Sequence, residues 1–254
     1  MKNRYKFSVL LSAGVPKEKR SKKYHTTFSK IRNAQLQIDE AVNCLTRSIL
    51  KNGGRLVFGG QQSISPLVAM VASETNYKNV SDFGQRLPDG EKPITIFQSE
   101  AFASVIPRET TNMAIQGNAD IVWFRAVNGE MYDPELEDRI QCSDSLDAMR
   151  RGMIDQPLDA MVCIGGMEGV EDEFELFRKI HPFKKVYLLH TTGGATSILA
   201  DLHSKNEFIK VPDSDFVNKI KIPDGETDIQ NEIMLIPYNY YSEMIVREII
   251  GQAK

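Results

Sequence analysis

The sequence predicts an α/β protein with a Rossmann-like, doubly wound and mostly parallel sheet that carries helices on both of its faces. Two observations predict this fold class. Short apolar runs typical of buried strands alternate with longer segments whose apolar residues recur at helical spacing. In addition, four of the apolar runs end in turns of small and polar residues, where parallel strands carry their ligand-binding loops.

Strands are predicted where a short apolar run is bounded by glycine, proline or polar residues. These runs occupy residues 7–11, 55–58, 93–97, 121–124, 159–164 and 185–189. Because helical segments separate the strands, neighbouring strands in the sheet are expected to be parallel.

Helices are predicted where apolar residues lie three or four positions apart. Pro66 suits a first helical turn and places Leu67, Met70 and Val71 on one apolar face. The predicted helices are 31–49, the segment that Pro66 opens, 146–154, a segment from Gly169, a short one after Thr196, and 241–249. The predicted loops are 17–23, 76–92 and 128–138.

Charge is distributed unevenly along the 254 residues, although the net charge is only −3. Residues 1–32 hold ten Lys and Arg against one acid, giving +9, whereas the remainder holds 21 basic and 33 acidic residues, giving −12. The basic loop 17–23 is either a solvated segment or a lid over an anionic ligand. Nucleic acid is disfavoured as a partner because most of the chain is acidic, and single-strand DNA binding would require a steep salt dependence.

Composition also indicates the cellular compartment and disfavours a disulfide framework, a membrane span and a metal site. Cys44, Cys142 and Cys163 lie far apart without a CxxC pair, which favours reduced thiols in a cytoplasmic protein. No apolar run is long enough to span a membrane, and the apolar stretch near the N-terminus is too short for a signal peptide. The four histidines show no metal-ligand spacing, so we expect neither a metal nor a required cofactor.

Four turns that follow predicted strands are expected to meet at one crevice and to hold a nucleotide-like or phosphate-bearing ligand. Glycines in these turns let the backbone approach a phosphate, and hydroxyl groups add hydrogen bonds. The candidate binding residues in the turns are Ser12, Gly14, Gly59, Gly60, Gln61, Gly165, Gly166, Glu168, Gly169, Thr192 and Gly193. Gln98-Ser99-Glu100, at the end of another strand, is a candidate for base or ribose contacts.

Residues 161–177 read as a strand, a glycine turn and a helix, and they supply the central motif. Glu173 falls one turn into the helix, within reach of a ribose hydroxyl or a glycosidic bond. Arg150 lies on the preceding helix, and its guanidinium fork suits a phosphate. Arg151 points about 100° away from Arg150, so at most one of the two faces a ligand. The alternative is an empty βα turn with two solvated arginines.

These residues resemble the SLOG superfamily, named for Smf/DprA and the Lonely Guy (LOG) proteins. Residues 56–60, with the helix that follows, resemble the LOG strand and glycine turn, and 165–173 resembles the LOG phosphate motif PGGxGTxxE. Arg150 lies close to the position of that family's catalytic arginine. The resemblance spans roughly residues 6–204 and is strongest to prokaryotic SLOG domains found beside TIR-type immune domains.

The chain departs from the LOG motif in its loops. Ile164 replaces the leading proline, one extra residue enters the loop, Val170 stands at the motif threonine, and Gln61 replaces a third glycine. LOG enzymes cleave the N-glycosidic bond of nucleoside monophosphates, and loss of the threonine hydroxyl argues against that activity. Glu171 and Asp172 add negative charge, which suits ribose hydroxyls or a bridging diphosphate better than a terminal phosphate.

The resemblance therefore implies a module that binds or senses a nucleotide or an NAD-derived, ADP-ribose-like ligand, in antiviral or stress signalling. The alternative is an N-glycosidic hydrolase of a nucleotide or NAD, in which Arg150 and Glu173 would be the catalytic residues. The expected partners are this small molecule, an effector protein and further copies of the chain. Residues 1–204 are predicted to form the nucleotide-binding domain, with 205–254 as a C-terminal extension packed on it.

Overall fold

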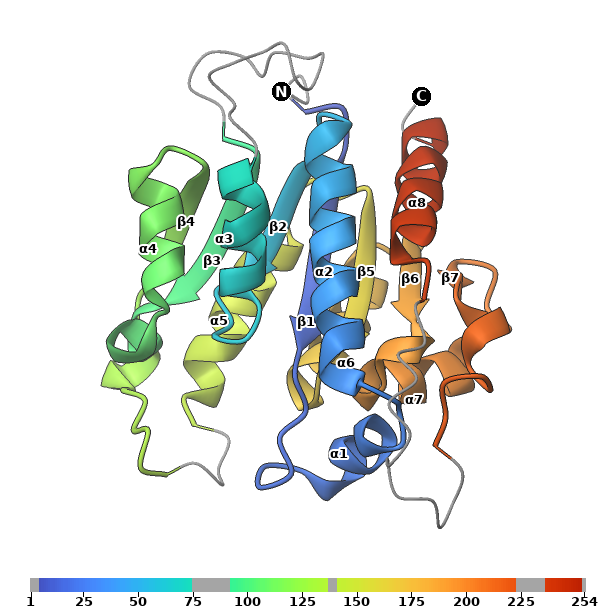
Figure 1. The fold of residues 1–254 in the computed structure, drawn as a ribbon. Coiled ribbons are helices and arrows are strands. Elements are labelled where there is room, and N and C mark those ends of the chain that lie inside the picture. Colours follow the sequence, from blue (N-terminus) through green and yellow to red (C-terminus); the bar gives the residue numbers. More distant parts are fainter. Residues whose placement is uncertain (1–4, 75–91, 137–140, 223–235, 253–254) are drawn as a thin grey trace.

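The computed structural model describes residues 5–74, 92–136, 141–222 and 236–252, and its centre is a sheet of seven strands (Figure 1). The strand order is β4-β3-β2-β1-β5-β6-β7, and every neighbouring pair is parallel. The strands are β1 (Ser8–Gly14), β2 (Arg55–Gly59), β3 (Ile94–Ser99), β4 (Ala119–Phe124), β5 (Ala160–Gly165), β6 (Lys185–Leu189) and β7 (Ile209–Lys210). The predicted fold class is confirmed.

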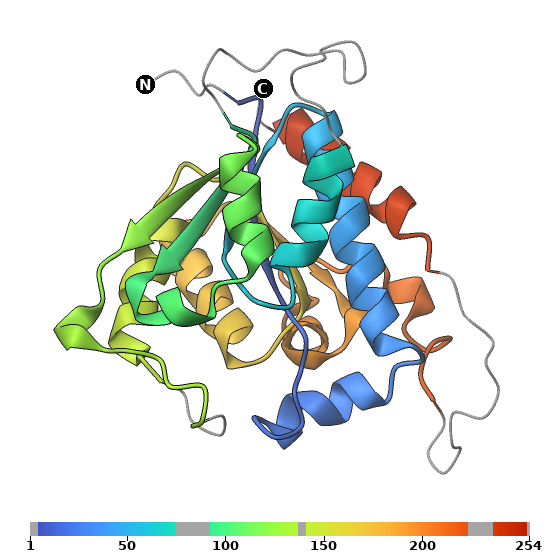
Figure 2. The ribbon, with the colours of Figure 1, turned by 60° about the vertical axis from the view of Figure 1, so that its left-hand side comes forward.

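Helices cover both faces of the sheet (Figures 1 and 2). The front layer of Figure 1 contains α2 (Ala34–Lys51), α3 (Ser65–Glu74), α4 (Arg108–Ile115) and α8 (Tyr238–Gln252). The opposite face carries α5 (Ser143–Ile154), α6 (Glu168–Ile180) and α7 (Gly194–His203). The short helix α1 (Lys22–Ser29) lies across the end of the sheet toward which the strands run.

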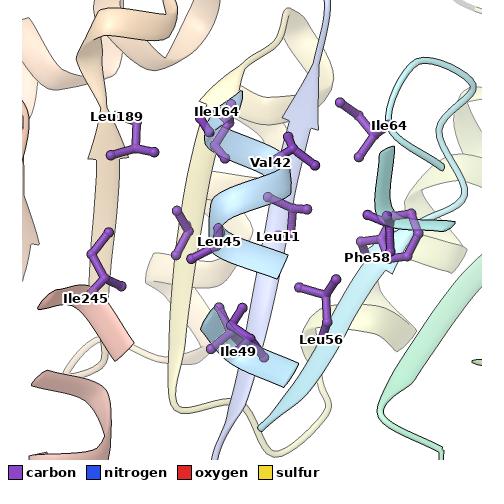
Figure 3. Packing of buried hydrophobic residues seen from close by; sticks show 14 of the residues in the cluster. Leu11, Val42, Leu45, Ile49, Leu56, Phe58, Ile64, Ile164, Leu189 and Ile245 are labelled. Atoms are coloured by element: carbon purple, nitrogen blue, oxygen red, sulfur yellow. The ribbon is translucent and has the colours of Figure 1, made fainter. Parts of the chain in front are cut away.

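The largest part of the core is the interface between α2 and the central strands (Figure 3). Val42, Leu45 and Ile49 recur at helical spacing on α2, are fully buried, and lie over Leu11 and Ile164 of β1 and β5. Burial of each such aliphatic side chain contributes roughly 1.5–3 kcal/mol to folding. This packing fixes β1 and β5 side by side, and the turns that follow these two strands form the centre of the site.

The structure differs from the predicted elements most clearly in the basic segment. Residues 17–23 were predicted as a loop, but Lys22 and Lys23 begin α1, where Tyr24 is only 4% exposed. The segment was predicted as a loop because it is highly charged. One buried aromatic residue attaches the helix to the body of the protein. The prediction for α3 was also partly wrong, since Met70 is 47% exposed and Val68 is buried instead. The elements α4 and β7 were not predicted.

Residues beyond 204 supply β7, which pairs with β6, and α8, which packs against α2. A buried carboxylate links this part of the chain to the end of β6. Asp213 accepts hydrogen bonds from the backbone N–H groups of His190 and Thr191 at 3.0 and 2.8 Å, and Thr191 Oγ1 lies 2.6 Å from the hydroxyl of Tyr238. The domain boundary near residue 204 stays a prediction.

Within the residues described, none of the helices is long and apolar enough to cross a membrane. The predicted loop 76–92 falls almost wholly outside those residues, as does the end of the predicted loop 128–138. The described part of the latter contains a short 3₁₀ helix, Val127–Gly129.

Candidate functional site

The carboxyl ends of β1 and β5 mark the point where the strand order reverses. From β1 the chain proceeds outward through β2, β3 and β4, and it then returns to place β5 on the other side of β1. In open parallel sheets, the loops at such a switch point diverge and ligands bind between them. Three of the four predicted turns follow β1, β2 and β5, so the topology brings them to this region.

The turn after β5 is braced by hydrogen bonds inside the protein. Gly14 pairs with Gly165 in the β1–β5 ladder, and its carbonyl accepts the N–H of Gly166 at 2.6 Å. The N–H of Gly165 donates to Thr192 Oγ1 at 2.8 Å, and that hydroxyl donates to the carbonyl of Leu189 at 2.6 Å. The predicted phosphate-binding groups of Gly165, Gly166 and Thr192 are therefore engaged within the fold.

Three predicted side chains meet directly at the switch point. Ser12 Oγ, on β1, donates a hydrogen bond to Glu173 Oε2 at 2.5 Å, although the two residues lie 161 positions apart in the sequence. On the other side of the carboxylate, Arg150 Nε lies 3.8 Å from Glu173 Oε1. The side chains of Arg150 and Glu173 are only 14% and 15% exposed. A strand, α5 and α6 thus combine to hold one carboxylate.

The environment of Glu173 disfavours its ionised form. Burial raises the pKa of the Glu173 carboxyl above its ordinary value of 4.5, the nearby Arg150 and the hydrogen bond from Ser12 lower it in part, and the charge of Asp172 raises it. Burial, with a smaller effect of Glu173, also raises the pKa of the Cys163 thiol. A carboxyl group with a raised pKa at a switch point can bind a hydroxyl group or transfer a proton.

Arg150 is the arginine that faces this centre, and Arg151 is exposed. Arg150 Nη1 lies 3.0 Å from an oxygen of Asp172 and 3.4 Å from one of Asp147. A Cβ atom on Gly169 would lie 2.9 Å from Arg150 Nη2, so this glycine leaves room for the guanidinium against the first turn of α6. Arg150 Nε has no hydrogen-bond acceptor among the described residues.

The first turn of α6 offers backbone donors beside this arginine. The N–H groups of Val170 and Glu171 bond to the carbonyl of Met167, at 2.9 and 3.4 Å. The preceding amides, those of Glu168 and Gly169, have no such bond among the described residues. Because a helix N-terminus carries partial positive charge, these two amides can donate hydrogen bonds to an anionic oxygen.

The turn after β2 borders the same centre. A Cβ on Gly59 would lie 3.6 Å from Met149 Cε on α5, and one on Gly14 would lie 3.0 Å from Gln61 Nε2. The Gly60 N–H already donates to a backbone carbonyl of β3 at 3.0 Å. We define the switch-point cluster as the predicted residues that the structure brings together here: Ser12, Gly14, Gly59, Gln61, Arg150, Glu168, Gly169 and Glu173.

Helix α1 contributes contacts that the sequence did not predict. The Tyr24 hydroxyl donates to Glu171 Oε2 at 2.7 Å, and Lys23 Nζ lies 2.9 Å from Glu171 Oε1. Gly193 lies beneath the same helix, since a Cβ there would be 2.9 Å from the Cα of Phe28. The spacing of Tyr24 and Phe28 is a helical signal within the basic segment. Part of that segment is thus attached beside the switch-point cluster.

Glu173 is expected to make stability depend on pH. A carboxyl whose pKa is higher in the folded than in the unfolded protein stabilises the fold below the unfolded pKa, and this contribution is lost as the pH rises through the folded pKa. Relative to wild type, Glu173→Gln should therefore gain unfolding free energy as the pH rises above about 4.5 and level off above the raised pKa. Urea unfolding between pH 4 and 8 measures this difference, and a constant difference would contradict the assignment.

The fold and the cluster define a Rossmann-like α/β protein whose switch point presents an arginine, a buried carboxyl and the N-terminus of a helix. The model of the SLOG cluster3 family matches residues 27–221, and the chain belongs to this family. The predicted SLOG membership is confirmed, and an association with TIR-type systems stays a prediction. Membership supports a nucleotide-related binding or glycosidase-like role in general.

Two further comparisons add no functional information. No curated protein matches the chain. Among solved structures, the X-ray structure of TM1055, a structural genomics target, is similar with 14% identity and a TM-score of 0.45 over 81% of this chain and 90% of that one.

Proposed function

We propose that this chain is a binding module for a nucleotide or an NAD-derived, ADP-ribose-like ligand, which it holds at the switch-point cluster. Binding would then be reported to an effector protein or through self-association. The proposal depends chiefly on one observation, the Ser12–Glu173–Arg150 contact at the reversal of the strand order. A carboxylate held between a hydroxyl and a guanidinium supplies both an acceptor for ribose and a cation for phosphate.

The charges around α6 favour a ribose or a bridging diphosphate over a terminal phosphate. Glu171 and Asp172 follow the two free amides on α6, and each already has a basic partner, Lys23 and Arg150 respectively. A dianionic terminal phosphate would have to approach both carboxylates. A diphosphate spreads its charge over two groups and reaches Arg150 and the α6 amides together.

The residue at position 170 supports binding without turnover over hydrolysis. Val170 stands where the LOG motif carries a threonine, and valine has no hydroxyl that could bind a phosphate. Its side chain packs inside the fold and is only 5% exposed. Catalysis depends on groups that hold the reacting bond within a narrow geometry. Loss of one phosphate contact weakens that positioning more than it weakens binding at the remaining groups.

One observation favours the alternative of an N-glycosidic hydrolase. The raised pKa of Glu173 is a property of general acids and bases, and Arg150 lies on the same carboxyl. In that reaction Glu173 would stabilise the oxocarbenium-like transition state or accept a proton from water, and water would replace the base at the ribose carbon.

Overnight incubation of the purified protein with NAD, AMP, ADP-ribose and cyclic ADP-ribose, followed by HPLC, separates the two proposals. A binding module should leave all four intact while at least one raises the melting temperature. Free base from the wild type but not from Glu173→Gln would establish the hydrolase and overturn the binding proposal. A panel that is neither cleaved nor bound would contradict both.

A further inference from the structure

Carboxylates from two helices lie around the guanidinium of Arg150, and only one of them is buried. Arg150 Nη1 lies 3.0 Å from Asp172 and 3.4 Å from Asp147, whose side chains are 56% and 63% exposed. Arg150 Nε lies 3.8 Å from Glu173, whose side chain is only 15% exposed. Water therefore stabilises the charges of the two aspartates, whereas the charge of Glu173 depends on Arg150 and on the hydrogen bond from Ser12.

The other groups that surround Glu173 are neutral or negative. From β1, Ser12 contributes an uncharged hydroxyl. From β5, Cys163 contributes a thiol whose pKa is raised by burial and by Glu173, so this group stays neutral. On α6 itself, the neighbouring Asp172 adds negative charge. Among the described residues, Arg150 is thus the cation that balances the charge of Glu173.

Helices α1 and α7 also pack near α6, but their titratable groups contact other residues. Lys23 and Tyr24 of α1 both bind Glu171. His203 of α7 stacks on Phe174, with 5.1 Å between the ring centroids. Neither helix therefore supplies a second counter-charge to the buried carboxyl.

A ligand can reach Arg150 from the surface without entering the core. Its Nη1 atom contacts the exposed Asp172, and the free amides of α6 belong to the half-buried Glu168 and Gly169. A diphosphate bound there would draw the guanidinium toward its own oxygens and add two negative charges near Glu173. The buried carboxylate would then lose part of its counter-charge at a place where water cannot replace it.

We propose that ligand binding at the switch-point cluster is coupled to the uptake of one proton by Glu173. This inference rests on the function proposed above and adds a regulation of that site, since the ligand binds more tightly as the pH falls. The proton comes from solvent and joins Glu173 Oε2 in the 2.5 Å contact with Ser12, whose hydroxyl can accept as well as donate a hydrogen bond. Uncharged Glu173 retains an acceptor oxygen for a ribose hydroxyl, and Arg150 is free to bind the diphosphate.

Burial prepares the carboxyl for this change, because it already raises the pKa of Glu173 in the free protein. Binding raises that pKa further. The affinity is therefore highest below the pKa of Glu173 in the free protein, and it falls as the pH rises toward the pKa in the complex.

Titration calorimetry with ADP-ribose and NAD tests this coupling. Both probes carry a bridging diphosphate and neither has a phosphate monoester, whose second ionisation at about pH 6 would itself exchange protons. Each pH is measured in MES and in imidazole, which differ in their enthalpy of ionisation, so the difference in binding heat gives the number of protons taken up. Between about pH 5.5 and 7.5, wild type should take up close to one proton at its maximum, and its affinity should fall by up to about tenfold per pH unit.

Two variants on α6 make the result specific to Glu173. Glu173→Gln has no charge at any pH, so it should bind without proton uptake and with an affinity close to that of wild type at low pH. Glu175→Gln, the same change at an exposed residue two positions further on, should keep the uptake of wild type.

The outcomes separate this coupling from the binding function. Binding by wild type without proton uptake, or uptake that survives in Glu173→Gln, would overturn this inference and leave the binding function standing. Failure of wild type to bind either probe would overturn the proposed function as well.

Discussion

Replacing Arg150 with methionine is expected to weaken binding of ADP-ribose by about 10- to 100-fold. A charge-assisted hydrogen bond contributes roughly 1.5–3 kcal/mol, and each 1.4 kcal/mol is a factor of ten in affinity. Arg150 is the cation beside the free α6 amides, and its side chain is only 14% exposed, so water screens it weakly. Methionine keeps most of the aliphatic stem while it removes the guanidinium. Titration calorimetry measures the change.

Arg151→Met is the matched control, because Arg151 is the next residue on α5 and is exposed. It removes the same charge from the protein, so any general effect of net charge on an anionic ligand appears in both variants. We expect Arg151→Met to change the affinity less than threefold, since exposed charges are screened. Equal losses in the two variants would show that Arg150 acts only through long-range charge, and would contradict the proposed contact.

The strands of this protein could be predicted because each is a short apolar run bounded by glycine, proline or polar residues. All six predicted strands occur in the structure, and β7, with two residues, is too short to carry a periodic signal. The basic helix α1 could not be predicted in the same way. Its stability comes from tertiary contacts of Tyr24 with α6, and the spacing of Tyr24 and Phe28 is only a weak local signal within a highly charged segment.

The candidate site was predicted at the level of topology and only partly at the level of side chains. The pairing of Ser12 with Glu173 follows from two motifs that meet once β1 and β5 are neighbours. The structural role of Thr192 could not be predicted. Its hydroxyl oxygen accepts a hydrogen bond from the N–H of Gly165, and this contact exists only in the folded turn. Small polar residues after strands thus include both proposed ligand contacts and residues whose hydrogen bonds lie within the fold, and the sequence alone does not separate them.

Gly165→Ala should be among the most destabilising single substitutions in the chain. Gly165 has φ of +60°, and a Cβ there would lie 2.5 Å from the backbone oxygen of Gly14 and 2.6 Å from Ile38 Cδ1. Left-handed backbone costs an alanine roughly 1–2 kcal/mol, and overpacking adds about 1–3 kcal/mol. We expect a loss of about 2–5 kcal/mol in the free energy of unfolding, measured by urea denaturation.

Gly117→Ala separates the two causes of that loss. Gly117 also has a positive φ, +79°, but a Cβ there would meet nothing within 4 Å. This variant should therefore lose only the backbone contribution, roughly 1–2 kcal/mol. If Gly165→Ala lost no more than Gly117→Ala, the β1 and β5 turns would be able to move apart at little cost. The close contact of Gly14 with Gly165 would then not be what holds Ser12 and Glu173 together, and the preformed geometry on which ligand binding depends would need another source.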